Sequence, residues 1–506
     1  MFAAATFTQP DIDWAALAPE LVLLGAAAIT LVVGVFLPLR LRRPFCATVT
    51  GLALVAAGIV AGILFGLDDH PSTLIRGSLA RDRLAELAQV FVCIAGLLAV
   101  GVSYWEARAP RPADVPEHLS DERERIAEYY TLLLAAVAGM AFFVQATTLM
   151  SLFLGLEWFS IALYVLTALA VDRLSSLEAG LKYLIVGSFG SAILLFGSAF
   201  VYGSTGELRF DAIGDAAPGT DRLFFVAGLA MILVGLAFKV SAAPFHMWTP
   251  DVYEGAPTAV MAFMATATKT IALAVLLRVM ITSFPMSSDI WEGAVAAVAI
   301  ASMLIGNIAA LRQTNVKRML AYSGVGQAGY LLIAVVVHTP LATRALLYYI
   351  AVYAAMNLGA LAVVSVRERE IGGPVSLEDL KGLGRDHPLL AGGLALSLLS
   401  LASFPPTGGF LAKVYLFGSA IDAGMSYLAV IGVIGTMISL AYYLRFLMAI
   451  YTPPGTVKPR PRIVPGTRLA ATAVLASAAI VLWLGIAPAP FIDVARTAAA
   501  SLVPHA

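Results

Sequence analysis

Long apolar runs separated by short polar stretches repeat along almost the whole chain. A helix needs about 20 apolar residues to cross a membrane, and about fourteen runs reach that length. They cover roughly 16–37, 45–66, 84–104, 126–145, 148–170, 178–202, 222–245, 257–281, 291–311, 318–338, 341–366, 388–419, 426–450 and 466–487. The pattern predicts an all-α polytopic membrane protein with about 14 transmembrane helices.

Two of the predicted spans are interrupted. The span 222–245 breaks at Ser241–Pro244, and the run 388–419, too long for one simple span, breaks at Pro405 and Pro406. The breaks lie five spans apart, so spans 4–8 and 9–13 would form two five-helix units. Because five crossings is an odd number, the second unit would be inverted relative to the first. Paired interrupted helices in two halves point to a transport site.

The expected organisation therefore has four parts, and helices 7 and 12 are expected to be discontinuous. The parts are a three-helix segment, two inverted five-helix repeats, and a final helix with its tail, over residues 1–125, 126–285, 286–452 and 453–506.

Composition supports the membrane class and excludes others. The chain is 60% hydrophobic and 13% charged, whereas soluble domains average about 25% charged. Lys+Arg and Asp+Glu balance at 32 each, so net charge indicates no nucleic-acid partner. The first basic residue is Arg40, so the start lacks the positive region of a secretory signal.

Basic residues indicate the orientation of the chain. One set of loops is much richer in Lys and Arg, beginning with Arg40, Arg42, Arg43, Arg108, Arg111, Arg123, Arg125 and Arg173. That side should be cytoplasmic. With an even number of spans, both termini are expected on the outer, periplasmic side. Arg278 and Arg445 lie near span ends and are expected to snorkel to the interface.

The sequence carries no convincing motif for a metal, iron–sulfur or nucleotide site. Cys46 and Cys93 lie in apolar runs without a CxxC motif, so no metal or iron–sulfur site is predicted. Gly324, Gly326 and Gly329 spell GxGxxG, but the motif sits inside an apolar span with no preceding strand. There, small residues are more typical of close helix packing than of nucleotide binding.

Three lysines lie deep in predicted spans, namely Lys239, Lys269 and Lys413. A charge at mid-bilayer costs roughly 2.5–3.5 kcal/mol, so such residues are functional candidates by default. Lys413 follows the second helix break, where freed backbone groups admit water and would allow proton exchange. A salt bridge to a neighbouring subunit is the alternative for Lys413.

Glu157 is the carboxylate that lies well inside a predicted span. It is expected to be protonatable or to partner a buried lysine; the alternative is a core polar residue bonded to a backbone carbonyl. Lys182, near the cytoplasmic face of the sixth span, could modulate a pair formed by Glu157 and Lys239. An interfacial, snorkelling lysine is the simpler reading of Lys182.

The polar connector HMWTPDVYEG adds supporting candidates. His246 has Asp251 and Glu254 as possible hydrogen-bond partners, and both a structural and a proton-relay role stay open. In the tenth span Gln327 cannot titrate but could bind a water chain.

The stretch PFHMWTPDVYEGAPT, followed by a lysine at Lys269, resembles the antiporter-like membrane subunits of respiratory complex I. Within them the chain looks most like the subunit N branch. The connector reads DVYEGAPT, the twelfth span carries Lys413 within GFLAKVYLF, and the chain ends after the fourteenth span without a lateral helix. The strong part of the resemblance covers about residues 125–450.

The resemblance implies roles for the candidate residues. Glu157 would pair with Lys239 and Lys182 would modulate that pair. Lys269 would be the central relay and Lys413 the group toward the outer exit. Gln327 stands where many relatives have a histidine, so water held by Gln327, Ser323 and Tyr322 would have to replace a histidine relay.

The resemblance also implies a function. Quinone reduction elsewhere in the complex would perturb the Glu157–Lys239 pair and drive a proton toward Lys269 and Lys413. Flavin, iron–sulfur clusters and quinone would bind other subunits, and none of them this chain. Partners would be subunits M, K, J and A, the lateral helix of subunit L, and lipids, in a bacterial cytoplasmic membrane. The alternatives are a subunit of a sodium/proton antiporter or membrane-bound hydrogenase, and a non-pumping scaffold.

Overall fold

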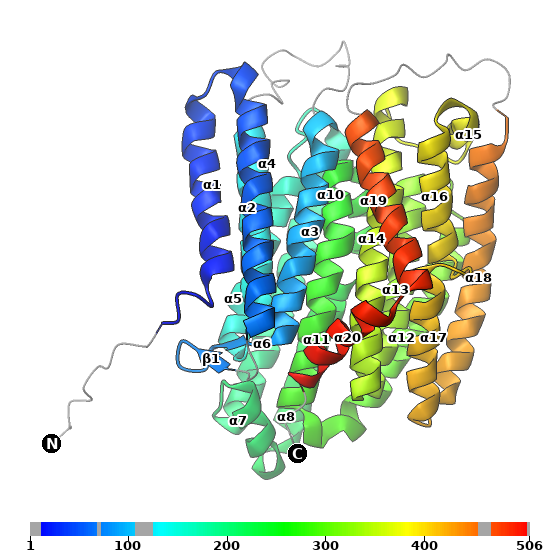
Figure 1. The fold of residues 1–506 in the computed structure, drawn as a ribbon. Helices are drawn as coiled ribbons and strands as arrows, with labels where there is room; N and C mark the ends of the chain where they lie inside the picture. Colours follow the sequence, from blue (N-terminus) through cyan, green and yellow to red (C-terminus); the bar gives the residue numbers. More distant parts are fainter. Residues whose placement is uncertain (1–11, 68–71, 107–124, 454–466, 503–506) are drawn as a thin grey trace.

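A computed structural model describes residues 12–67, 72–106, 125–453 and 467–502, and they form a bundle of long, roughly parallel helices (Figure 1). Within these residues, 13 helices are long and apolar enough to cross a membrane. The run predicted at 388–419 is built from two shorter helices, Pro388–Leu401 and Gly408–Asp422. The predicted all-α polytopic membrane fold is confirmed.

The helix bounds follow the hydrophobic runs closely. The first part holds α1 (Ala18–Phe36), α2 (Leu39–Leu67), α3 (Arg83–Glu106), α4 (Ile126–Val144), α5 (Leu149–Thr167), α6 (Leu174–Thr205), α7 (Phe210–Ala216), α8 (Arg222–Val240), α9 (Trp248–Gly255), α10 (Thr258–Phe263) and α11 (Lys269–Ser283). The second holds α12 (Ser288–Leu311), α13 (Val316–Val337), α14 (Pro340–Ile371), α15 (Leu383–Asp386), α16 (Pro388–Leu401), α17 (Gly408–Asp422), α18 (Ser426–Tyr451), α19 (Thr467–Ile486) and α20 (Ala489–Ala500). A short hairpin pairs β1 (Ser72–Leu74) with β2 (Leu79–Arg81).

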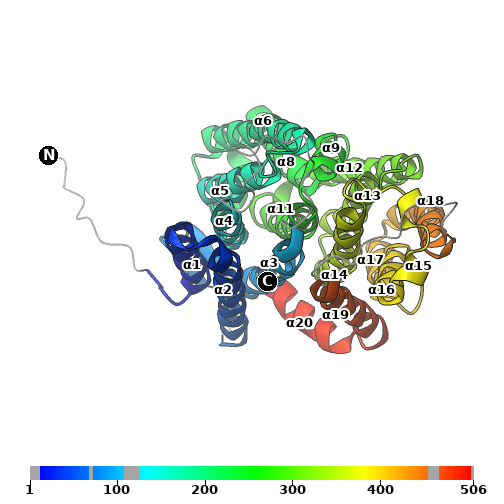
Figure 2. The same cartoon turned by 90° about the horizontal axis from the view of Figure 1, so that it is seen from above.

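Three long elements form the centre of the bundle. The continuous run Thr258–Ser283, which includes α10 and α11, is buried on all sides, and α13 and α14 are nearly so. By contrast, α1, α2, α6 and α18 expose a large share of their apolar side chains, as expected of helices that face lipid. Figure 2 shows α19 and α20 lying beside α14 and α3, so the end of the chain closes the bundle.

Both predicted breaks are present and share one backbone geometry. At the end of α8, Ser241 adopts φ 67°, and the amides of Ser241 and Ala242 donate to the carbonyls of Phe238 and Ala237. At the end of α16, Ser403 adopts φ 60°, and the amides of Ser403 and Phe404 repeat the two bonds. This is the Schellman ending of a helix, in which a left-handed residue turns the chain aside. The peptides before Pro244 and Pro406 are cis.

Other features were not expected from the sequence. The run Met264–Thr268 forms a π-helical turn between α10 and α11, immediately before Lys269. Such turns occur as single insertions in α-helices and are frequent at functional sites.

The matching breaks are what an internal repeat would give, while the division into two inverted repeats stays a prediction.

Arg278 does not snorkel as predicted. Its guanidinium donates two hydrogen bonds to Asp82 at the start of α3, with N–O distances of 2.5 and 2.8 Å. Both side chains are buried, at 5% and 3% exposure. Because α3 packs directly against α11, the carboxylate lies within hydrogen-bonding distance of Arg278. The pair ties the N-terminal three-helix segment to the central helix.

Candidate functional site

Lys239 lies in the last turn of α8, just before the first break, and is 3% exposed. Its ammonium donates to the hydroxyl of Ser160 at 2.7 Å and to that of Tyr183 at 3.2 Å. The Phe159 ring lies 4.4 Å away, within cation–π range. The lysine is therefore held by α5 and α6 through hydroxyls and an aromatic face.

Glu157 and Lys239 do not form the direct ion pair that was expected. Glu157 stands on α5 one turn before Ser160, and one of its carboxylate oxygens is buried without a hydrogen-bond partner. Ser160 supplies the nearer oxygen and takes the position at the ammonium. Glu157 therefore lies one helical turn from the residue that bonds Lys239.

Lys182 is exposed, in line with the interfacial interpretation, and does not contact the pair that it was expected to modulate. Its ammonium contacts Glu178 at 2.7 Å and Asp251 at 3.1 Å, and its side chain is 44% exposed. The helical periodicity of α6 turns Lys182 outward, while the next residue, Tyr183, points inward to Lys239. Lys182 therefore has no contact with Glu157 or Lys239, and any influence on them passes through Asp251 or Tyr183.

The connector carboxylates belong to an ionic network across three helices. Asp251 on α9 accepts from Lys182 of α6 and, at 2.6 Å, from Arg318 of α13. Glu254 accepts from Arg318 at 2.9 Å and from Asn315 at 3.0 Å. Burial disfavours the Asp251 carboxylate, but the bonds from Arg318 and Lys182 outweigh it, so the pKa of Asp251 lies below its ordinary value.

His246 does not bond either connector carboxylate. Its Nδ1 is buried without a hydrogen-bond partner, and its ring lies edge-on to Tyr322 at 6.3 Å between centroids. Tyr322 in turn lies near Arg318, 5.9 Å from ring centroid to guanidinium. The tight turn after the break directs His246 toward α13 rather than along α9. Tyr322 therefore belongs beside the ionic network.

Lys269 is the most enclosed of the three lysines, with no exposed surface. It follows the π-helical turn Met264–Thr268, and its ammonium donates to the backbone carbonyl of Gly324 on α13. The Tyr353 ring of α14 lies 5.8 Å from the ammonium. The central helix thus presents one charged group to a carbonyl and an aromatic ring.

The GxGxxG motif is explained by packing. A Cβ on Gly324 would meet the Lys269 ammonium at 2.6 Å, and one on Gly329 would meet the backbone of Met303 at 2.6 Å. On Gly326 it would meet the Asn307 side chain at 2.8 Å. The three glycines bring α13 close to Lys269 and α12, in agreement with the packing interpretation.

These contacts predict different effects for alanine at Gly324 and at Gly329. Gly324→Ala should displace the flexible end of Lys269 and crowd the Tyr353 hydroxyl, 3.3 Å from the added Cβ, so the protein should still assemble near normally. Gly329→Ala should push the backbone of α12 and cost about 1–3 kcal/mol of stability. Subunit abundance in membranes measures the difference. Equal loss of abundance in both variants would contradict the assignment.

Lys413 lies on α17, shortly after the second break, and is 3% exposed. Its ammonium donates to the hydroxyl of Thr436 on α18 at 2.9 Å. The Tyr330 ring of α13 lies 4.0 Å from it. Like Lys239, which contacts two hydroxyls, this lysine is held by hydroxyl oxygen and an aromatic face. In the described part of the chain no carboxylate pairs with it.

A chain of polar side chains joins the neighbourhoods of Lys269 and Lys413. Ser323, next to Gly324, is hydrogen-bonded to Tyr443 of α18, whose ring lies 4.3 Å from that of Tyr442. Tyr442 donates to the Asn307 carbonyl oxygen at 3.1 Å, and the Asn307 amide donates to Tyr330 at 3.0 Å. The Tyr330 ring then faces Lys413.

Gln327 lies beside this chain rather than in it. Its carbonyl oxygen accepts from Tyr349 of α14, and its amide donates at 3.4 Å to the carbonyl of Leu401, where α16 ends. Gln327 thus binds the second helix break. Of the three residues expected to hold water here, Ser323 and Gln327 lie near the path and Tyr322 lies by the ionic network.

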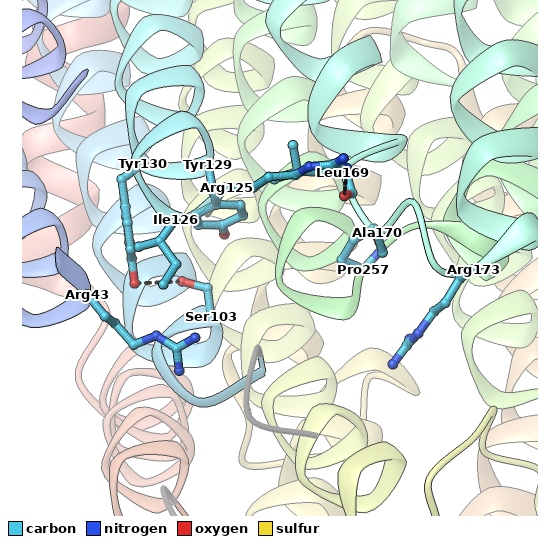
Figure 3. A pocket seen from close by; sticks show the side chains of 10 residues that line it. All are labelled: Arg43, Ser103, Arg125, Ile126, Tyr129, Tyr130, Leu169, Ala170, Arg173 and Pro257. Carbon is cyan, nitrogen blue, oxygen red and sulfur yellow. Dashed lines mark hydrogen bonds between the residues drawn. The ribbon is translucent and has the colours of Figure 1, made fainter. Parts of the chain in front are cut away.

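A cavity of about 100 Å³ opens elsewhere, at the ends of α2, α3 and α4 (Figure 3). Its lining includes Arg43, Arg125 and Arg173, but none of the buried lysines or their hydroxyl partners. It is therefore separate from the row of lysines.

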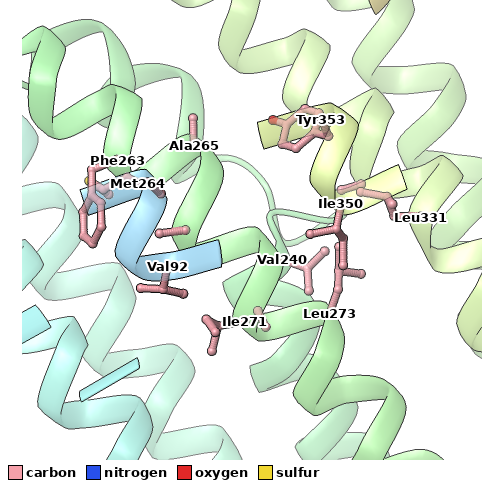
Figure 4. Close-up of a cluster of buried hydrophobic side chains, with 14 of the residues drawn as sticks. Val92, Val240, Phe263, Met264, Ala265, Ile271, Leu273, Leu331, Ile350 and Tyr353 are labelled. Atoms are coloured by element: carbon pink, nitrogen blue, oxygen red, sulfur yellow. The ribbon is translucent and has the colours of Figure 1, made fainter. Parts of the chain in front are cut away.

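An apolar cluster lies directly beside the lysines. Figure 4 shows Val240, Leu273, Leu331 and Ile350 directed toward one another from α8, α11, α13 and α14. Each is at most 1% exposed. Val240 adjoins Lys239, and Leu273 lies one turn beyond Lys269 in the part of the central helix that continues toward Ser283. All four side chains are apolar, so they form an apolar wall beside these two lysines.

Sequence reasoning missed most of the partners of the lysines. Asn307 carried a detectable signal, because an amide alone in an apolar span needs a partner. The tyrosines carried none, since aromatic residues in such spans are most often core packing. The residues missed are Ser160, Tyr183, Asn307, Tyr330, Tyr349, Tyr353, Thr436, Tyr442 and Tyr443.

Comparison with known proteins gives the family. Residues 146–439 match the model of the NADH:quinone oxidoreductase/Mrp antiporter membrane family. NADH-quinone oxidoreductase subunit N of Rhodospirillum rubrum is 37% identical over 490 residues, which is 96% of either chain. The chain belongs to the NADH-quinone oxidoreductase subunit N family. The protein of that name from Chloroflexus aggregans is 38% identical over 96% of this chain and 97% of its own.

Solved structures show the same fold. A chain of respiratory complex I from Thermus thermophilus is 32% identical and superposes with a TM-score of 0.78, over 94% of this chain and 98% of its own. A chain of the Mrp complex from Dietzia sp. superposes with a TM-score of 0.81 over 97% of each chain at 22% identity. That second likeness shows the fold alone.

Proposed function

We propose that this chain translocates protons in the membrane arm of an NADH:quinone oxidoreductase, in a bacterial cytoplasmic membrane with both termini outside. One observation carries the proposal. Lys239, Lys269 and Lys413 are buried, and in the described part of the chain their ammonium groups bond hydroxyls or a carbonyl rather than carboxylates. A lysine kept charged for structure alone would be paired, because an unpaired buried charge is costly.

The Glu157–Lys239 site acts as the switch. A negative charge on Glu157, one turn before Ser160 on α5, favours a proton on Lys239, and loss of that charge releases it. Quinone reduction elsewhere in the complex supplies the disturbance that changes Glu157. Lys182 influences the switch indirectly, since it holds Asp251 and adjoins Tyr183.

The outward path leads from Lys239 to Lys269 and then to Lys413. Ser323, Tyr443, Tyr442, Asn307 and Tyr330 line the second step and, with water, replace a histidine relay. Lys413 delivers the proton toward the outer side. The apolar cluster around Leu273 prevents the proton from escaping outward before it reaches Lys413.

The chain works as one subunit of a larger enzyme. The proposed partners are subunits M, K, J and A, the lateral helix of subunit L, and lipids. NADH oxidation and quinone reduction, with flavin and iron–sulfur clusters, belong to other subunits. The proposed task of this chain is to move charge, with no covalent or redox step of its own.

A subunit of a sodium/proton antiporter or of a membrane-bound hydrogenase is the alternative favoured by the shared fold. The proteins that co-purify with the chain distinguish these. A set that includes an NADH-oxidising module supports the proposal, and a set without one favours the alternative.

Lys413→Met tests the proposal in native membrane vesicles. The side chain keeps its length and loses its proton site, so proton uptake per NADH oxidised should fall while the complex still assembles. Proton-relay groups typically contribute factors of about 10²–10⁴ in rate, so the step through this chain should slow by at least about tenfold. Unchanged proton uptake per electron would leave the chain as a structural scaffold.

A further inference from the structure

A buried carboxyl in the three-helix segment takes no part in the proposed proton path. Glu20 lies in the first turn of α1 and is 4% exposed. Its Oε1 accepts a hydrogen bond from the amide of Gln89 on α3 at 2.9 Å, while its Oε2 is buried with no hydrogen-bond partner among the described residues. No basic side chain in the described ranges pairs with this carboxyl. Glu20 therefore differs from the carboxylates of this protein that pair with arginine or lysine.

Gln89 has the complementary deficit. Its side chain is 1% exposed, and its amide nitrogen donates to Glu20 and, at 3.5 Å, to the backbone carbonyl of Ala141 on α4. Because a backbone carbonyl only accepts, this second contact supports the orientation of the amide, with its nitrogen toward Glu20. The side-chain oxygen of Gln89 is buried with no partner in the described part of the chain. One hydrogen-bonded pair thus contains two buried oxygens that each need a donor.

A single proton on Glu20 would satisfy both oxygens. A protonated carboxyl carries one O–H donor, whereas a carboxylate can only accept. With the proton on Oε2, Glu20 can donate to the side-chain oxygen of Gln89 while it accepts from the Gln89 amide. The result is a cyclic acid–amide pair with two hydrogen bonds. Since buried polar atoms left without a partner are costly, this site favours the protonated carboxyl.

The alternative is an ionised Glu20 stabilised by the positive end of α1. A helix N-terminus stabilises a nearby anion only modestly, whereas an isolated carboxylate in apolar surroundings is very costly. Two guanidinium groups near the start of α3 do not offset that cost, because they bind other carboxylates. Arg81 pairs with Asp13 at 2.9 Å, and Arg278 with Asp82 at 2.8 Å. The balance of these effects favours the neutral acid.

We propose that Glu20 is a proton-binding site, with the proton held between its carboxyl and the side-chain amide of Gln89. Helix α1 packs mainly against α2 and α4, so the pair is a polar link from α1 to α3 (Figure 2). Loss of the proton would set carboxylate oxygens against the Gln89 oxygen and weaken that link. None of the buried lysines takes part, so the site is independent of the proposed proton transport.

The first test compares amide substitutions at two buried carboxyls in the whole complex. Glu20→Gln keeps the size and neutral state of the protonated acid and can pair with Gln89, so the thermal inactivation midpoint should change by less than about 2 °C. Asp82→Asn is the matched control, because it removes the charge that binds Arg278, and it should lower the midpoint by at least about 5 °C. An equal loss in both variants would overturn the proposal, since it would show that Glu20 acts as an anion.

Infrared spectroscopy of the purified complex detects the proton itself. Near neutral pH, the spectrum of wild type minus that of Glu20→Gln should contain the carbonyl band of one protonated carboxylic acid. Gln89→Leu removes the hydrogen-bonding partner, so the band should persist in that variant and move to higher frequency. Absence of the band from wild type would overturn the proposal even if Glu20→Gln is as stable as expected. Neither measurement reports on proton transport, so this site and the proposed function fail separately.

Discussion

Replacing Lys239 by methionine should abolish the response of proton transport to Glu157 while leaving the fold intact. Methionine fills nearly the same volume between Ser160, Tyr183 and Phe159, and it removes a costly buried charge. Proton uptake and coupled NADH oxidation should fall by about tenfold or more in vesicles, because the first relay group is lost. Subunit abundance should stay near wild type.

Variants of Glu157 and Lys239, alone and combined, test whether the two residues act at one site. Glu157→Gln should lower uptake as Lys239→Met does, and the double variant should be no worse than either, since both act at one site. Lys381→Met is the control, because Lys381 pairs with Glu378 in a loop outside the buried row. Normal uptake by Lys239→Met would remove this residue from the path. Additive losses of proton uptake in the double variant would show that Glu157 and Lys239 act at separate sites.

Replacing Asp82 by alanine should strongly destabilise the protein. The substitution leaves the Arg278 guanidinium buried without the carboxylate that accepts two of its hydrogen bonds. Breaking a buried ion pair in this way costs about 3–5 kcal/mol, a large part of the stability of a typical domain. Assembled complex in membranes and its thermal inactivation midpoint should both fall.

A paired replacement separates charge from packing at this position. Asp82→Leu combined with Arg278→Met should recover much of the loss, since a buried pair can be exchanged for apolar groups at little net cost. The exposed pair Asp493–Arg496 is the control, and Asp493→Ala should change stability little because solvent screens that contact. A single Asp82→Ala as stable as the control would show that Arg278 finds another partner.

The ionic network and the first break together explain how a distant event could reach the lysines. Asp251 and Glu254 sit on α9, which follows the break directly, and they bind α6 through Lys182 and α13 through Arg318. A shift of α9 would therefore move helices that carry the partners of Lys239 and Lys269. The turn at Ser241 is where the backbone direction changes.

The long apolar runs were sufficient to predict the helical architecture, because the bilayer requires the chain inside it to be helical. Backbone groups inside a membrane must be bonded within helices, so the long apolar runs formed helices, and the interrupted run 388–419 formed two. The helix breaks could also be predicted from the sequence, because Pro244, Pro405 and Pro406 interrupt a helix. The lysines were equally visible, because a charge in an apolar run is expensive wherever it occurs.

The partners of those lysines were decided only by the tertiary structure. Ser160 and not Glu157 bonds Lys239 because of how α5 and α8 are rotated against each other, which no single helix encodes. Asn307, Tyr442 and Tyr330 come from α12, α18 and α13 and meet only when these pack together. The sequence by itself determined where the charges lie along each helix. The packing between helices, which sets rotation and register, determined what each charge touches.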